Sequence, residues 1–222
     1  MSETSRMLYV VIGLGNFGNA VAVTISDTGT DLIAIDRDIL IVQELSERIP
    51  NVVCADARDI EMLKEAGVQD ADVAIVSMGS HLEESVMAIL NLKELGIKNI
   101  IAKANNERYK YVMERVGADT VIQPEYEMGQ RVALSLINPK IIDIYQMTND
   151  YAIMEIKVPE LWQGRSLSQL NLREIYGVNI IGIRRENEKK VVTDVDADYV
   201  LQNTDYLTIA ADTSRIASLN LD

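Results

Sequence analysis

Residue types that carry much of common enzyme chemistry are scarce in this 222-residue chain, which has one histidine, His81, and one cysteine, Cys54. A single cysteine excludes a disulfide framework and a metal site built from several thiolates, and it is typical of a reducing compartment. A single histidine removes most zinc sites, catalytic triads and histidine-based acid-base schemes. The chain therefore has few of the side chains that metal or acid-base catalysis commonly uses.

The sequence also has no long apolar run and no excess of basic residues. No run reaches the ~18 apolar residues that would span a bilayer, and the start, MSETSRMLYV, lacks the basic and apolar regions of a signal peptide. Acidic residues outnumber basic ones by 34 to 21, for a formal charge of −13. Since nucleic-acid binders usually present a clustered basic face, we expect a protein that binds no nucleic acid. The missing signal peptide and apolar run predict a cytoplasmic protein, which could still have a membrane-embedded partner.

What the chain does have is a regular alternation of short apolar runs and amphipathic stretches from Met7 to about Ile122. The apolar runs are rich in β-branched residues and nearly continuous, as expected for strands buried on both faces. This order predicts an α/β fold with a doubly wound parallel sheet of the Rossmann type. The expected strands cover 8–12, 31–36, 51–56, 72–78, 99–104 and 119–123, and the expected helices cover 16–28, 38–48, 58–66, 81–95 and 107–116.

The pattern changes after Pro124. Residues 126–137 predict a helix that is apolar on more than one side and needs cover from several directions. Asn138-Pro139 ends it, and 141–147 predicts a second short apolar helix. We therefore divide the chain into a Rossmann domain (7–124), a crossover helix-turn-helix that forms a subunit contact (125–148) and a small α+β domain (149–222). In the last we expect strands at 151–159, 178–185, 189–195 and 206–211, and a helix at 166–177.

Three glycines, Gly13, Gly15 and Gly18, stand in GLGNFG, after the first expected strand and at the start of a helix. In this context the first glycine permits a tight turn, the second lets the backbone approach a pyrophosphate, and the third allows close packing of helix and strand. The phosphates would lie at the N-terminus of the helix. The motif predicts a dinucleotide-type binding site.

Two carboxylates follow the next two strands. Asp36 ends the second strand, where an acidic residue binds ribose hydroxyls. It would repel a 2′-phosphate, although Arg37 beside it weakens that discrimination, so NAD or an adenine nucleotide is favoured over NADP. Asp56 in CADARD either reaches the adenine edge or caps the helix that begins near Asp59.

A hydride-transfer enzyme would also need a proton donor beside the nicotinamide. His81 follows the fourth strand near the expected crevice, but it begins a helix, where Ser80 or His81 more often serves as a cap. Lys103, at the end of the fifth strand, either meets a phosphate or is simply solvated, and the chain has no GxxxxGK[ST] motif. The residues favour a site that holds a nucleotide without reacting. An NAD-dependent oxidoreductase using His81 is the alternative, and a redox-sensing repressor is disfavoured by the acidic charge.

Six motifs taken in order point to a known family: GLGNFGNAVA, AIDRD, CADARD, AKANNE, GADTVIQPEYEMG and LNLREIYGVNIIGIRR. Together they resemble the regulatory subunits of bacterial Trk/Ktr potassium-uptake systems, built from RCK (regulator of potassium conductance) domains, over nearly the whole chain. The resemblance implies a gating subunit rather than an enzyme. It implies a homodimer joined through the crossover helices, and commonly an octameric ring at the inner face of the membrane, beneath a membrane-embedded potassium transporter or channel. ATP versus ADP, or NADH versus NAD, would change the shape of the ring.

The resemblance also assigns roles to residues. Asn16 stands where Ktr-like members often have an arginine on the terminal phosphate, which favours NAD or ADP over sensing of a γ-phosphate. Glu125 stands where relatives place an acid that helps to hold a divalent cation, which would also need the phosphates or a second subunit. The expected cofactor-binding residues are Gly13, Gly15, Asn16, Phe17, Gly18, Asp36, Arg37, Asp56, Ala57 and Lys103.

A second ligand site is implied in the C-terminal domain. One segment aligns with residues that in Ktr-type proteins bind cyclic di-AMP across a dimer interface, where arginines from two chains can meet two phosphates. The same residues also fit the structural core of this domain, and the arginine among them could pair with an acid. They are Asn171, Arg173, Asn179 and Ile180.

Overall fold

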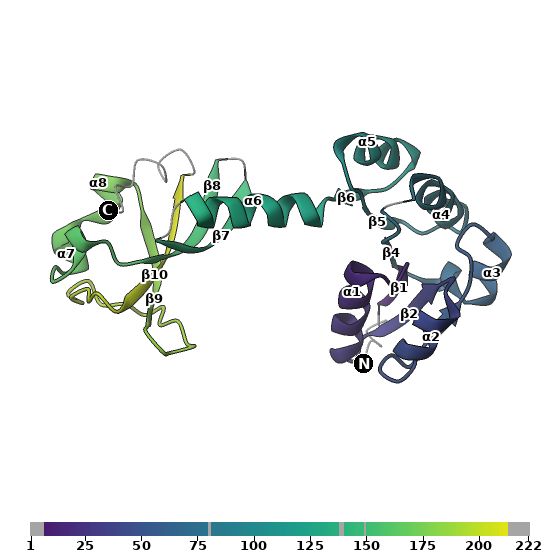
Figure 1. The fold of residues 1–222 in the computed structure, drawn as a ribbon, viewed down its shortest axis with the longest axis horizontal. Helices are drawn as coiled ribbons and strands as arrows, with labels where there is room; N and C mark the ends of the chain where they lie inside the picture. The colour runs from purple at the N-terminus through teal and green to yellow at the C-terminus, as the bar shows by residue number, and fades with distance from the viewer. Residues whose placement is uncertain (1–6, 80, 138–139, 149, 213–222) are drawn as a thin grey trace, which may run out of the picture. The chain divides into compact units, whose positions relative to one another are not determined.

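The computed structural model describes residues 7–79, 81–137, 140–148 and 150–212. The chain divides between residues 126 and 127 into two compact units, the N-terminal unit and the C-terminal unit (Figure 1). Three sequence-based expectations fall largely on residues outside the described ranges: the missing signal peptide (1–6), a cap at Ser80, and the helix end at Asn138-Pro139.

The N-terminal unit is built on a six-stranded sheet in which every neighbouring pair is parallel. The strand order is β3-β2-β1-β4-β5-β6, so the order reverses between β1 and β4. This confirms the predicted doubly wound sheet and places a crevice at the carboxyl ends of these two strands. The strands are β1 (Leu8–Ile12), β2 (Asp31–Asp36), β3 (Val52–Cys54), β4 (Val73–Val76), β5 (Asn99–Lys103) and β6 (Thr120–Ile122).

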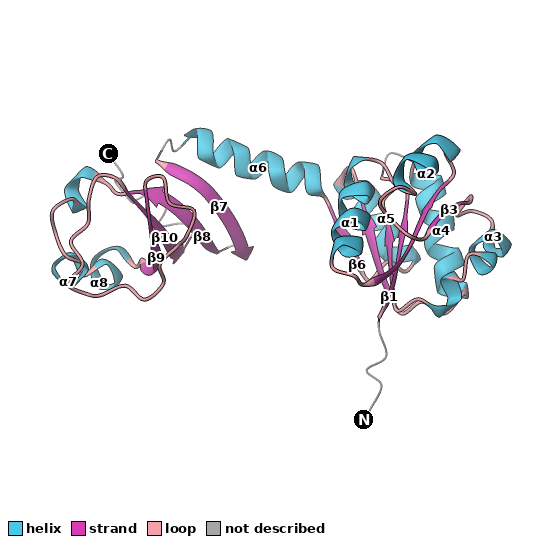
Figure 2. Ribbon diagram, turned by 90° about the horizontal axis from the view of Figure 1, so that it is seen from below, coloured by secondary structure: helices cyan, strands magenta, loops and turns pink. Residues whose placement is uncertain are grey.

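Helices cover both faces of this sheet (Figure 2). Because side chains alternate along a strand, Val10 and Ile12 of β1 pack into one buried cluster with Ile89, while Val11 packs into another with Ala22. The first cluster lies under α3, α4 and α5, and the second under α1 and α2. The helices are α1 (Asn16–Asp27), α2 (Ile39–Leu45), α3 (Ile60–Glu65), α4 (Leu82–Glu94) and α5 (Glu107–Val116), with the short 3-10 helix η1 at Val68–Asp70.

The starts of these helices fall into two groups. Asp38, Asp59 and Asn106 cap α2, α3 and α5, and each side chain accepts a hydrogen bond from a backbone N–H of the first turn. In contrast, α1 begins after Gly15, which has no side chain to offer, and His81 at the start of α4 makes no side-chain cap bond. The uncapped helices α1 and α4 both start at the crevice, since they follow β1 and β4.

The C-terminal unit is a small α+β structure, as predicted. Helix α6 (Pro124–Ile137) begins in the N-terminal unit and continues into this one. The four strands of the C-terminal unit pair antiparallel in the order β7-β8-β10-β9, and its core includes Met154, Trp162 and Leu207. The elements are β7 (Ile141–Thr148), β8 (Tyr151–Lys157), η2 (Glu160–Trp162), α7 (Leu167–Leu170), α8 (Leu172–Tyr176), β9 (Asn179–Arg185) and β10 (Asp205–Asp212).

The helix predicted at 141–147 is wrong, because these residues form strand β7. The pairing with β8 shifts register between Ile141 and Asp143, which marks a β-bulge or similar irregularity. The extra residue places Ile141 and Ile144, which are 2% and 4% exposed, on the same side at a spacing of three. This spacing imitates one face of a helix, so the expected crossover helix-turn-helix is instead a helix followed by a strand.

Two further predictions in the C-terminal unit need correction. The helix expected at 166–177 is broken at Asn171, whose φ of 43° lies in the left-handed region, so that α7 ends and α8 begins there. Of the strand expected at 189–195, the structure shows only an isolated bridge between Ile183 and Val192. The remaining strands and helices agree with expectation to within a few residues.

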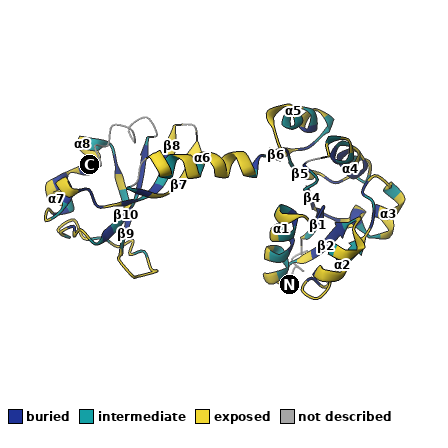
Figure 3. Ribbon diagram, viewed as in Figure 1, coloured by how far each residue is buried: buried dark blue, intermediate teal, exposed yellow. Residues whose placement is uncertain are grey.

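Helix α6 has no buried residue within the chain, although it carries large apolar side chains. Figure 3 shows it exposed along most of its length. Met128, Val132, Leu136 and Ile137 are 53%, 51%, 76% and 73% exposed.

Among the described residues, no helix is both long and apolar enough to cross a bilayer.

Candidate functional site

Each glycine of the first turn meets a different structural demand. Gly13 has a φ of +85°, which L side chains rarely adopt, and a Cβ there would lie 2.8 Å from Cγ of Met78. A Cβ on Gly18 would lie 1.8 Å from the Gly13 carbonyl oxygen, so helix α1 approaches the turn too closely for any side chain. A Cβ on Gly15 would meet nothing within 4 Å. Gly13 and Gly18 are thus needed by the fold, whereas Gly15 keeps open a space outside it.

The start of α1 borders that space. The first intrahelical bond runs from Asn19 N–H to the Gly15 carbonyl at 2.8 Å. The N–H groups of Asn16, Phe17 and Gly18 therefore have no acceptor within the helix, and the helix dipole adds partial positive charge there. This is the environment that binds a phosphate.

A hollow of about 490 Å³, here called the Lys103 hollow, lies beside this helix start. The Lys103 side chain is 14% exposed, and its Nζ donates a hydrogen bond to Glu125 Oε1. This hydrogen bond holds the pKa of Glu125 below its usual value. The hollow is lined by Gly15, Asn16, Phe17, Ser77, Gly79, Lys103, Asn105 and Glu125.

The pairing with Lys103 bears on the expected cation at Glu125. Over the described residues, no group of three or more histidine, cysteine or acidic side chains could surround a metal ion. The single carboxylate of Glu125 also faces an ammonium group that competes for it. A cation here would depend on ligand phosphates or on a second subunit.

A second hollow of about 240 Å³, here called the Asp36 hollow, adjoins the first, and both are lined by Gly15 and Ser77. Asp36 Oδ2 accepts a hydrogen bond from Leu14 N–H at 2.7 Å, and its Oδ1 accepts one from Asp38 N–H at 2.9 Å. The carboxylate therefore fixes the glycine turn to β2. It retains lone pairs for further donors such as ribose hydroxyls.

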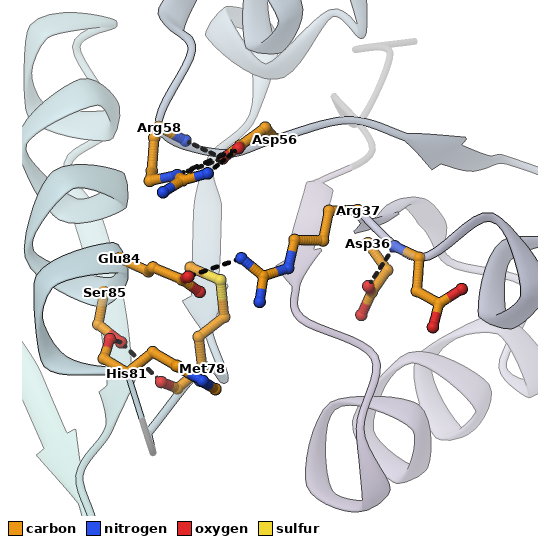
Figure 4. A network of polar contacts seen from close by, with 9 residues as sticks. Asp36, Arg37, Asp56, Arg58, Met78, His81, Glu84 and Ser85 are labelled. Carbon is orange, nitrogen blue, oxygen red and sulfur yellow. Dashed lines mark hydrogen bonds and ion pairs between the residues drawn. The ribbon is translucent and has the colours of Figure 1, made fainter.

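Asp56 also lines the Asp36 hollow. Its Oδ2 lies 2.5 Å from Arg58 Nη2, and this hydrogen bond lowers the pKa of Asp56 to about 2 (Figure 4). Asp59 itself caps α3, so the interpretation of Asp56 as the helix cap is wrong. Its position at the hollow wall agrees with the other alternative, a carboxylate near the bound base.

Two residues that line the Asp36 hollow form an ion pair that sequence reasoning missed. Arg37 Nη1 lies 2.6 Å from Glu84 Oε1, although the residues are 47 positions apart (Figure 4). Ser77 was also missed: its hydroxyl is buried and has no hydrogen-bond partner in the described structure. The sequence signal for Ser77 was its position directly after β4, at the point where the strand order reverses. The ion pair joins the end of β2 to the first turn of α4 and has no local sequence signal.

The predicted cofactor-binding residues thus come together around two adjoining hollows. Gly15, Asn16, Phe17 and Lys103 line the Lys103 hollow, and Gly13, Gly15, Asp36, Arg37, Asp56 and Ala57 line the Asp36 hollow. Gly18 lies behind them, packed against Gly13. His81 lines the Asp36 hollow.

The four residues expected to bind a second ligand also lie together. In the C-terminal unit, a hollow of about 400 Å³ is lined by Asn171, Arg173, Asn179 and Ile180. No ion pair joins Arg173 to an acidic side chain within the described residues.

The fold is a Rossmann-type domain with a candidate phosphate site, followed by a small α+β domain. Residues 9–124 match the TrkA-N domain family, and residues 152–220 match the TrkA-C domain family. The chain therefore belongs to the family of TrkA-N and TrkA-C proteins, and the resemblance to Trk/Ktr proteins is confirmed.

Two relatives illustrate the relationship. The chain is 31% identical over 209 residues to the Ktr system potassium uptake protein C of Bacillus subtilis (strain 168), covering 94% of each chain. It is 28% identical over 216 residues to the Ktr system potassium uptake protein A of Vibrio alginolyticus, covering 97% of each. The relationship thus extends over both units.

Solved structures agree on the fold. A structure of the GsuK channel superposes with a TM-score of 0.70 at 17% identity, and one described as the GsuK channel bound to NAD superposes with a TM-score of 0.66 at 16% identity. Each covers 99% of this chain but only 40% of the channel chain. The chain therefore spans well under half the length of the channel chains that share its fold.

Proposed function

We propose that this chain is a nucleotide-sensing regulatory subunit that assembles into a ring on the cytoplasmic face of the cell membrane and gates a membrane-embedded potassium transporter or channel. One observation carries the proposal: the glycine turn and Asp36 line the same hollow, in a chain whose near full-length relatives are named potassium uptake proteins. A ligand that prefers one arrangement of the subunits shifts the assembly by its difference in affinity between the arrangements.

The ligand proposed for the N-terminal unit is an adenine nucleotide, either NAD/NADH or ADP/ATP. The two hollows meet at Gly15 and Ser77, next to the uncapped start of α1. This arrangement suits a molecule with anionic phosphates at its centre and a ribose at Asp36. Asn16 in place of an arginine favours NAD or ADP over sensing of a γ-phosphate.

The position of His81 supports binding without turnover. His81 lines the Asp36 hollow, at the ribose end of the site. A nicotinamide would lie beyond the phosphates, in the Lys103 hollow, where a proton donor for hydride transfer would be needed. An NAD-dependent oxidoreductase would therefore need a donor other than His81, and we propose that the protein is not an enzyme.

The assembly proposed is a homodimer joined through α6, with dimers forming a larger ring, commonly an octamer in the family it resembles. The exposed apolar side chains of α6 support this, because contiguous apolar surface of this kind marks protein contacts. The functional domains we propose are 7–124, the linking segment 125–148, now a helix and a strand, and 149–222.

Two further ligands belong to the proposal. A divalent cation would bind between Glu125 and the nucleotide phosphates. Cyclic di-AMP would bind in the hollow around Arg173, since a guanidinium group from each of two subunits can meet its two phosphates.

The deciding experiment identifies the nucleotide that the purified protein retains, by mass spectrometry, and then measures thermal unfolding with ATP, ADP, NAD and NADH. We expect stabilisation by at least one of them and a mass in solution of two or more chains. A monomer that none of the four stabilises would contradict the proposal. Turnover of NAD⁺ or NADH would favour the oxidoreductase instead, and its loss in His81→Ala would show that His81 is the donor after all.

A further inference from the structure

The ion pair between Arg37 and Glu84 joins two residues that line the Asp36 hollow. Arg37 directly follows β2, and Glu84 stands in the first turn of α4, which follows β4. Since β1 separates β2 from β4 in the sheet, the pair spans the carboxyl end of β1, where the order of the strands reverses. Both residues line the hollow.

The two side chains differ in exposure. The Arg37 side chain is 52% exposed and that of Glu84 only 16%. Figure 4 shows the guanidinium extending from the end of β2 toward Glu84, rather than back toward the carboxylate of Asp36. Glu84 is therefore the fixed partner, and Arg37 is the long side chain whose position depends on it.

The chemistry of the ribose edge gives this contact a consequence. An arginine next to the ribose-binding acid is the side chain that accommodates a 2′-phosphate in NADP-binding sites of this fold. Arg37 has that position in the sequence, but its guanidinium already has a carboxylate partner at 2.6 Å. A 2′-phosphate would have to compete with Glu84 for this guanidinium, because the ion pair directs the arginine toward α4.

The second guanidinium near the hollow is also committed, because Arg58 binds Asp56. Four charged side chains line the hollow, those of Asp36, Arg37, Asp56 and Glu84, and Arg58 pairs with Asp56, so these five groups carry three negative and two positive charges. The local balance is negative, and each arginine is held by an acid. Such a site repels an additional phosphate.

We propose that Glu84 is a specificity-determining residue that holds Arg37 away from the ribose 2′ position, so that the site takes nucleotides with a free 2′-hydroxyl and rejects 2′-phosphorylated ones. The inference rests on the proposed nucleotide site. It also changes the role of Arg37. This residue weakens the discrimination by Asp36 against a 2′-phosphate only when Glu84 does not hold its guanidinium.

The test compares NAD⁺ with NADP⁺, which differ only in the 2′-phosphate, by equilibrium titration of the purified full chain and of Glu84→Gln. Releasing Arg37 is expected to reduce the preference for NAD⁺ about tenfold, through tighter binding of NADP⁺, with NAD⁺ affinity changing by less than about threefold. The pair 5′-AMP and adenosine 2′,5′-bisphosphate gives the same comparison if the protein takes mononucleotides rather than NAD⁺.

Two controls separate the proposed mechanism from a general loss of negative charge. Glu83→Gln removes the same charge from the same exposed turn of α4 without removing the partner of Arg37, and it should leave the preference unchanged. Adding Arg37→Ala to Glu84→Gln should abolish the gain in NADP⁺ affinity, because the gain depends on the released guanidinium. Thermal unfolding without ligand, expected to change little, shows that each variant is folded.

The outcomes distinguish two failures. Unchanged preference in a folded Glu84→Gln that still binds NAD⁺ or 5′-AMP would overturn this inference and leave the proposed function standing. An equal shift in Glu83→Gln, or a gain that persists without Arg37, would also overturn it. If the wild-type chain binds no adenine nucleotide, the proposed function fails and this inference fails with it.

Discussion

At the residue scale, the Asp36 carboxylate has two tasks. It accepts hydrogen bonds from Leu14 and Asp38 N–H groups, which fixes the glycine turn against β2. It also lines the hollow where a ribose would bind. A substitution that removes both acceptor oxygens therefore affects folding and binding together, whereas one that removes the charge and keeps one acceptor oxygen affects folding less.

Asp36→Asn should lower nucleotide affinity about tenfold or more and should lower stability less than Asp36→Ala does, because the amide oxygen still accepts one of the two backbone hydrogen bonds. Asp36→Ala should lower affinity and also the midpoint of thermal unfolding. Asp31→Asn, at the other end of β2, is the control and should change neither. Titration calorimetry and calorimetric unfolding measure both quantities. Unchanged nucleotide affinity in Asp36→Asn would refute the ribose assignment.

Gly15 and Gly18 make a matched pair, because one faces open space and the other faces backbone. Gly15→Ala should leave the free energy of unfolding within about 1 kcal/mol of the wild type, the size of an N-cap effect. It should lower nucleotide affinity at least about tenfold, since the methyl group enters the phosphate approach. Gly18→Ala should destabilise the ligand-free protein by about 1–3 kcal/mol or more, through overpacking against the Gly13 carbonyl.

Denaturant unfolding and nucleotide titration of the two glycine variants check this separation. A Gly15→Ala protein that binds nucleotide like the wild type would show that the open space beside Gly15 is not the phosphate site.

The pair formed by Asp56 and Arg58 gives a pH prediction. The hydrogen bond from Arg58 lowers the pKa of Asp56 from 3.8 to about 2 in the folded chain. A carboxyl group whose pKa is lower in the folded than in the unfolded chain stabilises the fold fully at pH values above the unfolded pKa, here 3.8. This contribution is lost as the pH falls through the folded pKa of about 2. Carboxyl NMR should show Asp56 ionised at pH 3 in the wild type. In Arg58→Gln the titration midpoint should return toward 3.8, and equal midpoints in the two proteins would contradict the assignment.

The sequence alone identifies the residues of the glycine turn and Asp36, because their spacing within one strand-turn-helix unit is local. It could not identify the pairs Arg37–Glu84 and Lys103–Glu125, which join positions 47 and 22 apart. Such contacts depend on how strand ends meet in the folded sheet. A local sequence pattern therefore does not reveal these contacts.

At the element scale, the buried parallel strands were predictable because continuous β-branched runs have few alternative interpretations. The C-terminal unit was harder for specific reasons. A register shift in β7 places Ile141 and Ile144 at helical spacing, and left-handed Asn171 divides one amphipathic run into α7 and α8. Both irregularities change the period of the pattern, which is the property that sequence reasoning uses.

Helix α6 provides the prediction at this scale. Leu136→Glu should dissociate the proposed dimer, because it places a charge in an apolar contact. Leu40 of α2 is a matched control: it is 70% exposed against 76% for Leu136, so Leu40→Glu should leave the assembly unchanged. Light scattering coupled to size-exclusion chromatography measures the mass. An unchanged mass in Leu136→Glu would show that α6 is not the contact.

At the scale of the whole molecule, the two units carry separate hollows, one in the Rossmann sheet and one around Arg173. A regulatory subunit that integrates two ligands must couple these sites through its assembly. Coupling between two binding sites is a free energy, and it is reciprocal by thermodynamic necessity. Because of this reciprocity, the coupling can be measured as the effect of either ligand on the affinity for the other.

We therefore expect saturating ADP to change the affinity for cyclic di-AMP by about fivefold or more, and saturating cyclic di-AMP to change the affinity for ADP by the same factor. Arg173→Ala should remove cyclic di-AMP binding and with it the effect on ADP, while ADP affinity measured alone stays unchanged, because Arg173 lies in the other unit. Titration calorimetry with each ligand in the presence of the other gives both factors. If both ligands bind and neither changes the affinity for the other, the two units bind their ligands independently. The proposed ring then does not transmit the nucleotide state to the C-terminal unit. The proposed gating would then have to run through the N-terminal units alone.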